Sequence, residues 1–593
     1  MNALYDFAKR GGLPPFSSLT ADQVVPAIRA LLADLERERA VLEAEAAPTW
    51  ESVVERVADL VEPIERAWGA VSHLNAVQNS PALREAHQTV QPEVVGAFLS
   101  LAQSQPLYRA LEGLHQSPAF VALAPSRRRI LDKKLLDAKL AGISLPEDQR
   151  ARFTAIETEL SELATTFQNH VLDATKAFSL TLTDKADVDG LPPSALAMAS
   201  AQARAAGAAS STPETGPWRV TLDFPSIDPF MRYSTRRDLR EQLYRANVTR
   251  ASELDAAAPA TNNGPLIDRI LVLRAEKARM LGYQTFAALS LASKMAPSVD
   301  EVERLLAELL TSSKKPAEGE LAELKALAGH DIAHWDVGFY AERLREQRYA
   351  YSEEELRPYF PMPRVLDGLF ALVHRIFAID VTDATSEAPR WHPDVRFFRV
   401  RDKSGAEIAS FYLDPFARPA DKRGGAWMDD CITRRRLATA LRTPVAYLCC
   451  NGSPPVDGKP SLMTFREVET LFHEFGHGLQ HMLTRVDDVD VSGIRGVEWD
   501  AVELPSQFME NWCTHKETLL GMSKHVDTGA RLPDALFQKV KAAKTFRAAS
   551  MMLRQIHFAR VDLELHHRYD ASKESVLDVN RRIAREVLVL PLL

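Results

Sequence analysis

Apolar residues recur at steps of three and four along most of this chain, and this spacing constrains its fold more than any other feature. The pattern runs over 21–45 and 147–178, with charged residues between, and returns over 266–281 and 299–327. Such spacing places apolar side chains along one stripe of an α-helix. No internal repeat is evident, which favours an irregular bundle over a solenoid. We therefore predict a mainly α fold, with an N-terminal helical lobe over residues 1–185.

Two kinds of segment interrupt the helical pattern. Residues 186–217 turn to Ala, Ser, Gly and Thr, a composition typical of a linker, so that 218–593 is expected to form a separate domain. Within that domain, 395–401 and 407–414 flank the turn sequence DKSG, which indicates a β-hairpin. Residues 443–450 fit a third strand. The sequence thus predicts a small antiparallel β-region beside the segment 464–481.

Composition narrows the class of protein. The 593 residues are 46% hydrophobic and 26% charged, ordinary values for a globular chain. A net charge of −8 argues against a nucleic-acid partner, because phosphate binding needs a basic field. No stretch approaches the roughly 20 apolar residues that span a bilayer. Four cysteines are too few for a disulfide framework. We expect a cytoplasmic protein without membrane or obligate protein partners, although an organelle would fit if a longer precursor exists.

The segment from Thr464 to His481 reads TFREVETLFHEFGHGLQH. Thr464 followed three residues later by Glu467 is a capping-box signature, so a helix is expected to begin there. His473 and His477 are four residues apart, close to one turn of about 3.6 residues. Both imidazoles therefore lie on one side of the helix and can meet at one metal ion.

Two neutral imidazoles suit Zn²⁺, which keeps one coordination position open in catalytic sites. Glu474 is offset by about 100° from His473, where it would activate a water beside the metal rather than bind the metal itself. With 16 histidines in the chain, an accidental H-E-x-x-H motif has a probability of roughly 3%. A third ligand is therefore required before the motif can be interpreted.

The segment GVEWDAVELPSQFMENW (496–512) supplies candidates for that ligand. It carries four carboxylates among large apolar side chains, where burial without partners would be costly. One glutamate would complete a His₂Glu zinc set, and the alternative is an amphipathic helix with a solvated acidic face. The four carboxylates are Glu498, Asp500, Glu503 and Glu510.

HEFGHGLQH followed by VEWDAVELPSQFMENW closely resembles the thimet oligopeptidase and oligopeptidase A family, with oligopeptidase A the nearest branch. The likeness extends over most of the chain from about 217 and is fainter in the N-terminal part. It implies helices from two lobes around a deep channel, one zinc ion per chain, and endopeptidase activity on short oligopeptides. It also implies that Glu503 is the third zinc ligand, in a catalytic domain over 218–593.

A further carboxylate is expected to orient His473 through its second ring nitrogen. Glu469 lies one turn before His473 on the same face and is one candidate for this role. Asp500, one turn before Glu503, is the other candidate. For each residue the alternative is an ordinary ion pair. His481 extends the row of histidines, but a fourth protein ligand would close the open position, so we expect it to be packed. Solvated positions are expected for His557, His566 and His567.

The sequence departs from the family after the third ligand. A Gly- and Tyr-rich family segment, HIFAGGYxxGYYSY, binds substrate and stabilises the oxyanion in relatives, and the chain ends at RRIAREVLVLPLL without one. We interpret this apolar ending as a core element cut short. Because the segment that binds substrate in relatives has no match here, the sequence identifies no substrate-binding residues. Uncovered apolar surface is expected beside Val587, Leu588, Val589, Leu590 and Leu592.

Three hypotheses follow from these features. The first is a zinc-dependent endopeptidase that hydrolyses short peptides. The second is a truncated, catalytically impaired remnant that binds metal or peptides. The third is a dipeptidyl carboxypeptidase, which would need a basic group to hold the free carboxylate of its substrate, and nothing in the sequence singles that group out.

Overall fold

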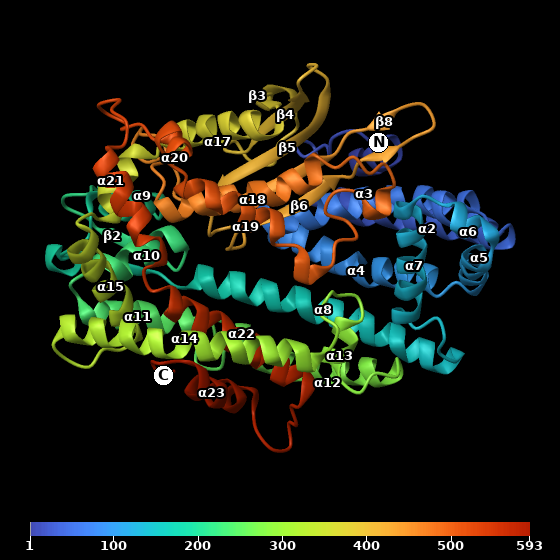
Figure 1. Ribbon diagram of the computed structural model, residues 1–593, viewed down its shortest axis with the longest axis horizontal. Helices are drawn as coiled ribbons and strands as arrows, with labels where there is room; N and C mark the ends of the chain where they lie inside the picture. Colours follow the sequence, from blue (N-terminus) through green and yellow to red (C-terminus); the bar gives the residue numbers. More distant parts are fainter. Residues whose placement is uncertain (1, 593) are drawn as a thin grey trace.

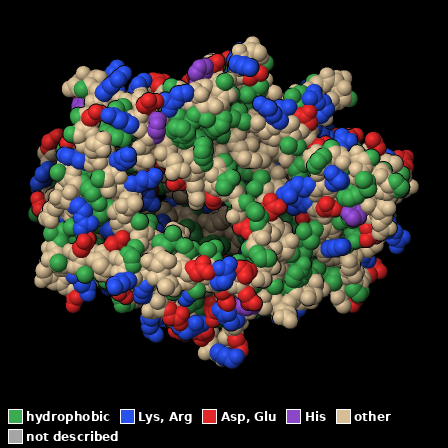
Figure 2. Space-filling model, viewed as in Figure 1, with side chains coloured by type: hydrophobic (Ala, Val, Ile, Leu, Met, Phe, Trp, Pro, Cys, Tyr) green, Lys and Arg blue, Asp and Glu red, His purple; other side chains and the backbone are tan. Residues whose placement is uncertain are grey.

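The computed structural model describes residues 2–592 and is mainly helical. Its helices form two lobes that lie one above the other in Figure 1. Figure 2 shows a hollow near the middle of the same face, where Figure 1 has α19 (Leu504–Glu510) above and α8 (Glu147–Ala177) below. No helix in the described range is both long and apolar enough to cross a membrane. The predicted two-lobed helical fold is confirmed.

The upper lobe combines the start of the chain with residues that follow much later. Its N-terminal helices lie at the right of Figure 1, and the sheet and later helices lie beside and above them. The N-terminal helices are α1 (Ala3–Arg10), α2 (Ala21–Ala44), α3 (Arg56–Val77), α4 (Pro81–Ala102), α5 (Gln105–Gln116), α6 (Pro118–Ala122) and α7 (Pro125–Leu140). The later ones are α16 (Glu353–Leu356), α17 (Met362–Phe377), α18 (Phe465–Met482), α19, α20 (Lys516–Met522) and α21 (Asp534–Ala542).

A five-stranded sheet lies within this lobe, in the order β3-β4-β5-β9-β6. The predicted hairpin is confirmed as β4 and β5, and the third predicted strand is β9. The β-region is mixed rather than antiparallel, because β5 and β9 run parallel. A parallel pair needs a long crossover, and residues 417–444 supply it. The strands are β3 (Ile379–Asp383), β4 (Arg396–Asp402), β5 (Glu407–Phe416), β6 (Trp427–Ile432) and β9 (Val445–Gly452).

Both faces of this sheet are buried. Phe398 and Phe411 point into a core shared with α17 and α18. Their neighbours Phe397 and Tyr412 point the opposite way, into a core shared with the N-terminal helices. This alternation is the period-two geometry of a strand. The N-terminal helices therefore share a core with strands from the second half of the chain, which differs from the predicted division at 185 and 217.

The predicted linker, 186–217, contains a helix. Residues Pro193–Ala205 form α9, which packs against β2 (Trp218–Val220) and buries Met198 and Ala203. Alanine has the highest helix propensity of all residues, so an Ala-rich stretch is better suited to a helix than to a flexible linker. α10 (Phe224–Tyr233) follows and contacts both β9 of the upper lobe and α15 (His334–Tyr349), thereby joining the lobes.

The lower lobe is mainly helical, and the predicted helices 147–178, 266–281 and 299–327 are confirmed as α8, α12 and α14. The apolar ending packs against this lobe from Val587 to Val589. The expected uncovered apolar surface is present beside Leu592, which lines a pocket together with the exposed side chains of Val248, Leu254 and Leu577. Val587 is buried, and Leu588 and Val589 pack on the core shared by α14 and α22. Lys314 donates to the carbonyl oxygens of Val587 and Leu588 at the end of α23. The remaining helices are α11 (Arg237–Val248), α12 (Gly264–Met280), α13 (Phe286–Leu291), α14 (Val299–Ala328), α22 (Ala548–His567) and α23 (Val576–Val587).

Candidate metal centre

The helix α18 begins where its capping box predicts. The Thr464 hydroxyl accepts from Glu467 N at 3.1 Å, and Glu467 Oε2 accepts from Thr464 N at 2.7 Å. The other oxygen of Glu467 accepts from the backbone and hydroxyl of Ser453, which follows β9. These bonds satisfy donors that a helix start leaves open, and they fix α18 to the sheet.

Gly476, between the two histidines in sequence, lets α19 approach α18 closely. A Cβ atom at this position would lie 2.5 Å from Pro505 O and 2.6 Å from the Cα atom of Ser506. Only glycine tolerates that contact without a shift of the backbone. Because Glu503 immediately precedes α19, this contact brings its carboxylate over the face of α18 that carries His473 and His477.

The structure brings together His473, His477 and Glu503. One ligand-type atom from each lies within 4.8 Å of the other two. Glu503 Oε2 is 3.2 Å from Nε2 of His473 and 3.2 Å from Nε2 of His477. Two neutral imidazoles and a carboxylate form a donor set that suits Zn²⁺.

The spacing of these atoms fits such an ion. Zinc bonds of about 2.0–2.1 Å in a tetrahedral arrangement place ligand atoms roughly 3.3–3.4 Å apart. The two 3.2 Å separations are close to that value. The site is also exposed on one side: the Glu503 side chain is 52% exposed, whereas that of His477 is 10% exposed. One side of the three-residue cluster is therefore open to a water or a substrate.

The carboxylate beside the second ring nitrogen of His473 is Glu510. The Nδ1–H group donates to Glu510 Oε1 at 2.6 Å, and this bond is the main reason that the pKa of His473 is raised. The bond fixes the tautomer that leaves Nε2 free to bind a metal. Glu510 is seven residues after Glu503 and so returns to the same side of the chain after about two helical turns.

Neither predicted orienting residue occupies that position. Both ring nitrogens of His473 face the segment around α19, so Glu469, on the same helix as His473, is not the carboxylate bonded to it. Burial, and then the nearby charge of Glu510, raise the pKa of Glu469 to about 7. Asp500 points away and accepts from the backbone N–H groups of Met295 and Ala296 in the lower lobe. It therefore links the lobes.

Sequence reasoning also missed Ser506. Its hydroxyl lies 2.7 Å from Glu503 Oε2 and 2.9 Å from the Glu503 carbonyl oxygen. Ser506 is itself fully buried, so its rotamer is restricted by packing. The serine three residues after a candidate ligand at a helix start is the sequence signal for this contact.

Glu474 lies beside the cluster and not in it. Its side chain is buried, and its Oε2 atom has no hydrogen-bond partner among residues 2–592. Burial raises the pKa of this carboxyl to about 7; the neighbouring His473 opposes the shift and Glu503 adds to it. A buried carboxyl of this kind can exchange a proton near neutral pH.

The other histidines are placed differently. His481 is fully buried and its Nε2 atom is 2.9 Å from Ile432 O, consistent with the packed position expected for it. The surface positions expected for the α22 histidines are wrong in part. His557 is buried, and His566 Nε2 lies 2.9 Å from Arg274 because α22 packs between α12 and α14.

A helix-borne H-E-x-x-H motif, with a carboxylate at the residue before a following helix, is typical of a class of zinc metallopeptidases. Within that class, the chain belongs to peptidase family M3. The model of that family matches residues 230–592, and the model of the neurolysin and thimet oligopeptidase N-terminal domain matches residues 28–150. The predicted family resemblance is thereby confirmed.

Individual proteins agree with this assignment. The chain is 48% identical over 590 residues to the organellar oligopeptidase A of Arabidopsis thaliana, covering 98% of this chain and 74% of that protein. It is 42% identical over 587 residues to oligopeptidase A of Escherichia coli, covering 98% of this chain and 85% of that protein. A solved structure of PZ peptidase A with an inhibitor matches in fold, with a TM-score of 0.53 at 12% identity over 98% of this chain and 81% of that one.

Proposed function

We propose that this protein is a zinc-dependent endopeptidase that hydrolyses short oligopeptides. The observation that carries the proposal is the convergence of His473, His477 and Glu503, with Glu474 buried beside them. The three converging residues would hold one zinc ion. Membership of family M3 and the similarity to enzymes named oligopeptidase A support the peptide substrate.

Each residue has a distinct part in this proposal. Bound zinc would supply a Lewis acid that activates water and polarises the peptide carbonyl. Glu474 would accept the proton of the attacking water and then deliver it to the leaving amine. Glu510 would hold His473 in the tautomer that binds metal, and Ser506 would hold the carboxylate of Glu503.

The location and partners remain part of the proposal. We infer a cytoplasmic protein whose partners are short peptides, with an organelle as the alternative, since one relative is named chloroplastic/mitochondrial. The metal is expected at one ion per chain. The hollow near the middle of the face shown in Figure 2 supports an extended peptide as the substrate.

The test uses internally quenched peptides with both ends blocked. Zinc-loaded protein should cleave them, chelation should abolish cleavage, and added zinc should restore it. A dipeptidyl carboxypeptidase would require the free carboxylate and would cleave only the unblocked version. A catalytically impaired remnant would bind zinc and cleave neither peptide, which would contradict the proposal.

A further inference from the structure

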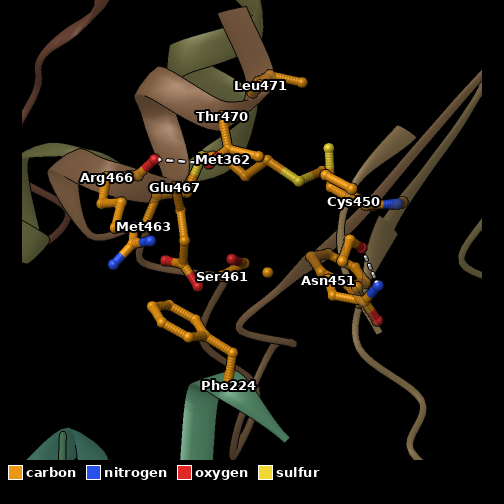
Figure 3. Close-up of a pocket in the computed structure, with 15 residues that line it drawn as sticks. Phe224, Met362, Cys450, Asn451, Ser461, Met463, Arg466, Glu467, Thr470 and Leu471 are labelled. Carbon is orange, nitrogen blue, oxygen red and sulfur yellow. Dashed lines mark hydrogen bonds between the residues drawn. The ribbon is translucent and has the colours of Figure 1, made fainter. Parts of the chain in front are cut away.

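A second feature lies on the same helix face as the two histidines. Residues seven apart in an α-helix return to within about 20° of each other. Arg466 is seven residues before His473, and Thr470 is seven before His477, so both share the face that carries the candidate ligands. Arg466 and Thr470 border a pocket of about 270 Å³ (Figure 3).

The walls of this pocket come from five helices and strands, α10, α17, β5, β9 and α18, and from neighbouring loops. Figure 3 shows Phe224, at the start of α10, facing Arg466 and Glu467 of α18, with Cys450 and Asn451 of β9 on another side. Most of the wall is apolar. The apolar lining residues include Phe224, Met362, Phe416, Cys450, Met463 and Leu471.

The polar side chains in the wall are already engaged by the protein. Both carboxylate oxygens of Glu467 accept hydrogen bonds, from Ser453 and from Thr464. The Ser461 hydroxyl donates to Ser453 O at 2.7 Å, and the Asn451 amide donates to Arg423 O at 3.0 Å. These groups therefore leave little polar capacity for a ligand, and an apolar one is favoured.

Arg466 supplies a positive charge at the rim. Its side chain is exposed, and its guanidinium lies 5.0 Å from the centre of the Phe224 ring, in cation–π contact. The one carboxylate in the lining, Glu467, is held by the capping bonds of α18 and is turned to its own backbone donors. Asp228 and Glu469 also interact with Arg466, but both lie outside the lining. A lysine or arginine side chain entering the pocket would therefore meet the guanidinium group of Arg466 at the rim.

The size of the pocket matches one large side chain. An apolar cavity of about 150 Å³ holds a benzene molecule, so about 270 Å³ accommodates an aromatic ring or a long aliphatic chain. The distance along the helix also fits. At about 1.5 Å per residue, Thr470 is roughly 4.5 Å and Arg466 roughly 10.5 Å from His473 along the axis. An extended peptide advances about 3.4 Å per residue, so these distances correspond to one to three residues.

We propose that this pocket, between α18, β9 and Phe224, binds a large apolar side chain of the substrate one to three residues from the cleaved bond, and that Arg466 excludes basic side chains from it. This inference rests on the proposed peptidase function and adds a substrate preference to it. Thr470 and Arg466 are the residues through which the preference can be altered without touching the candidate metal ligands.

The test is a set of end-blocked, Ala-rich quenched peptides in which one residue, Phe, Lys or Ala, is moved one position at a time. Products are mapped by mass spectrometry. The native protein should cut at a fixed distance from Phe, with kcat/KM at least about tenfold above the Ala peptide, the usual effect of filling an apolar pocket. Thr470→Trp, which fills the pocket, should bring that ratio close to one.

Thr311→Trp is the matched control. Thr311 lies on an exposed face of α14, and its hydroxyl donates to Ala307 O as that of Thr470 donates to Arg466 O. The Thr311→Trp variant should keep the native ratio of kcat/KM between the Phe and Ala peptides. Arg466→Glu, an exposed change that does not fill the pocket, should raise cleavage of the Lys peptide several-fold relative to the Phe peptide. Arg531→Glu, with the same change of charge at an exposed position after α20, should not.

The outcomes separate this inference from the proposed function. Hydrolysis that ignores the position of Phe, or a Thr470→Trp variant that keeps the native ratio, would overturn the pocket assignment while leaving the peptidase intact. Absence of hydrolysis of every peptide by zinc-loaded native protein would overturn the proposed function. The pocket is then tested by fluorescence anisotropy with labelled Phe and Ala peptides, and equal binding of both to native protein would overturn it as well.

Discussion

The Nδ1 atom of His473 lies 2.6 Å from Oε1 of Glu510, a residue on the helix that follows the third candidate ligand. Because Nε2 of the same ring lies 3.2 Å from Glu503, one imidazole is held between two carboxylates of one short segment. The ring orientation therefore depends on how α19 crosses α18. This relationship gives the first prediction.

Glu510→Gln should weaken zinc binding by about 10- to 100-fold, because an uncharged amide oxygen is a weaker acceptor than the carboxylate that makes His473 a better ligand. Zinc affinity would be measured by competition with a chromophoric chelator. Asp500→Asn is the matched control, since Asp500 accepts from backbone groups of the lower lobe and contacts no candidate ligand. Equal losses in both variants would show that Glu510 has no special role.

Gly476→Ala should separate α19 from α18. The added Cβ atom would clash with the backbone at Pro505 and Ser506, and overpacking of this kind costs about 1–3 kcal/mol of stability. The displacement should also lower zinc affinity, because Glu503 moves with α19. Chemical denaturation and metal analysis would measure the two effects.

Gly319→Ala on α14 is the control for that substitution. A Cβ atom there meets nothing within 4 Å, so the change should stabilise the protein by about 0.5–1 kcal/mol, the usual gain in a helix interior. If Gly476→Ala were as stable as Gly319→Ala and bound zinc normally, the close contact between α18 and α19 would not be required.

The third prediction concerns acid stability. His73 is buried against Tyr447, with ring centroids 3.8 Å apart, and neither ring nitrogen has a hydrogen-bond partner among the described residues. Burial lowers the pKa of His73 from 6.5 to about 3. Between those pH values the unfolded chain binds a proton at His73 that the folded chain does not, so stability falls as pH falls.

His73→Phe should keep the ring stacking and remove the contribution of His73 to the pH dependence of stability. Its free energy of unfolding should fall less steeply than that of native protein between pH 6.5 and about 4, by an amount on the order of a few kcal/mol. His87, whose pKa burial lowers to about 4, would keep part of the slope. Urea denaturation at a series of pH values is the measurement, and identical slopes in the two proteins would contradict the prediction.

The sequence predicted those parts of the site that depend on local geometry. The start of α18 and the shared face of His473 and His477 follow from helix periodicity and a capping box, both encoded within one segment. Glu510 could not be chosen over Glu469 or Asp500, because the choice depends on the packing of α19 against α18. The sequence marks that packing only through Gly476, whose need for close approach is visible once the partner helix is placed.

In the fold, too, local elements could be predicted from the sequence and long-range pairings could not. Long helices such as α8 and α14 follow from their own residues, and the hairpin of β4 and β5 follows from its turn. The parallel pairing of β5 with β9, and the core that N-terminal helices share with the sheet, join segments far apart in sequence. No local pattern specifies such pairings. The missed helix α9 is a different error, since its alanines were interpreted by composition instead of by propensity.

A comparison of native protein with Glu474→Gln decides whether the three converging residues hold zinc while Glu474 transfers the proton. Zinc content and hydrolysis of an end-blocked peptide would be measured for native protein and for Glu474→Gln side by side. We expect one zinc per chain in both proteins and a loss of about 10²–10⁴-fold in kcat in the variant. Loss of zinc from Glu474→Gln, or hydrolysis at the native rate, would contradict it.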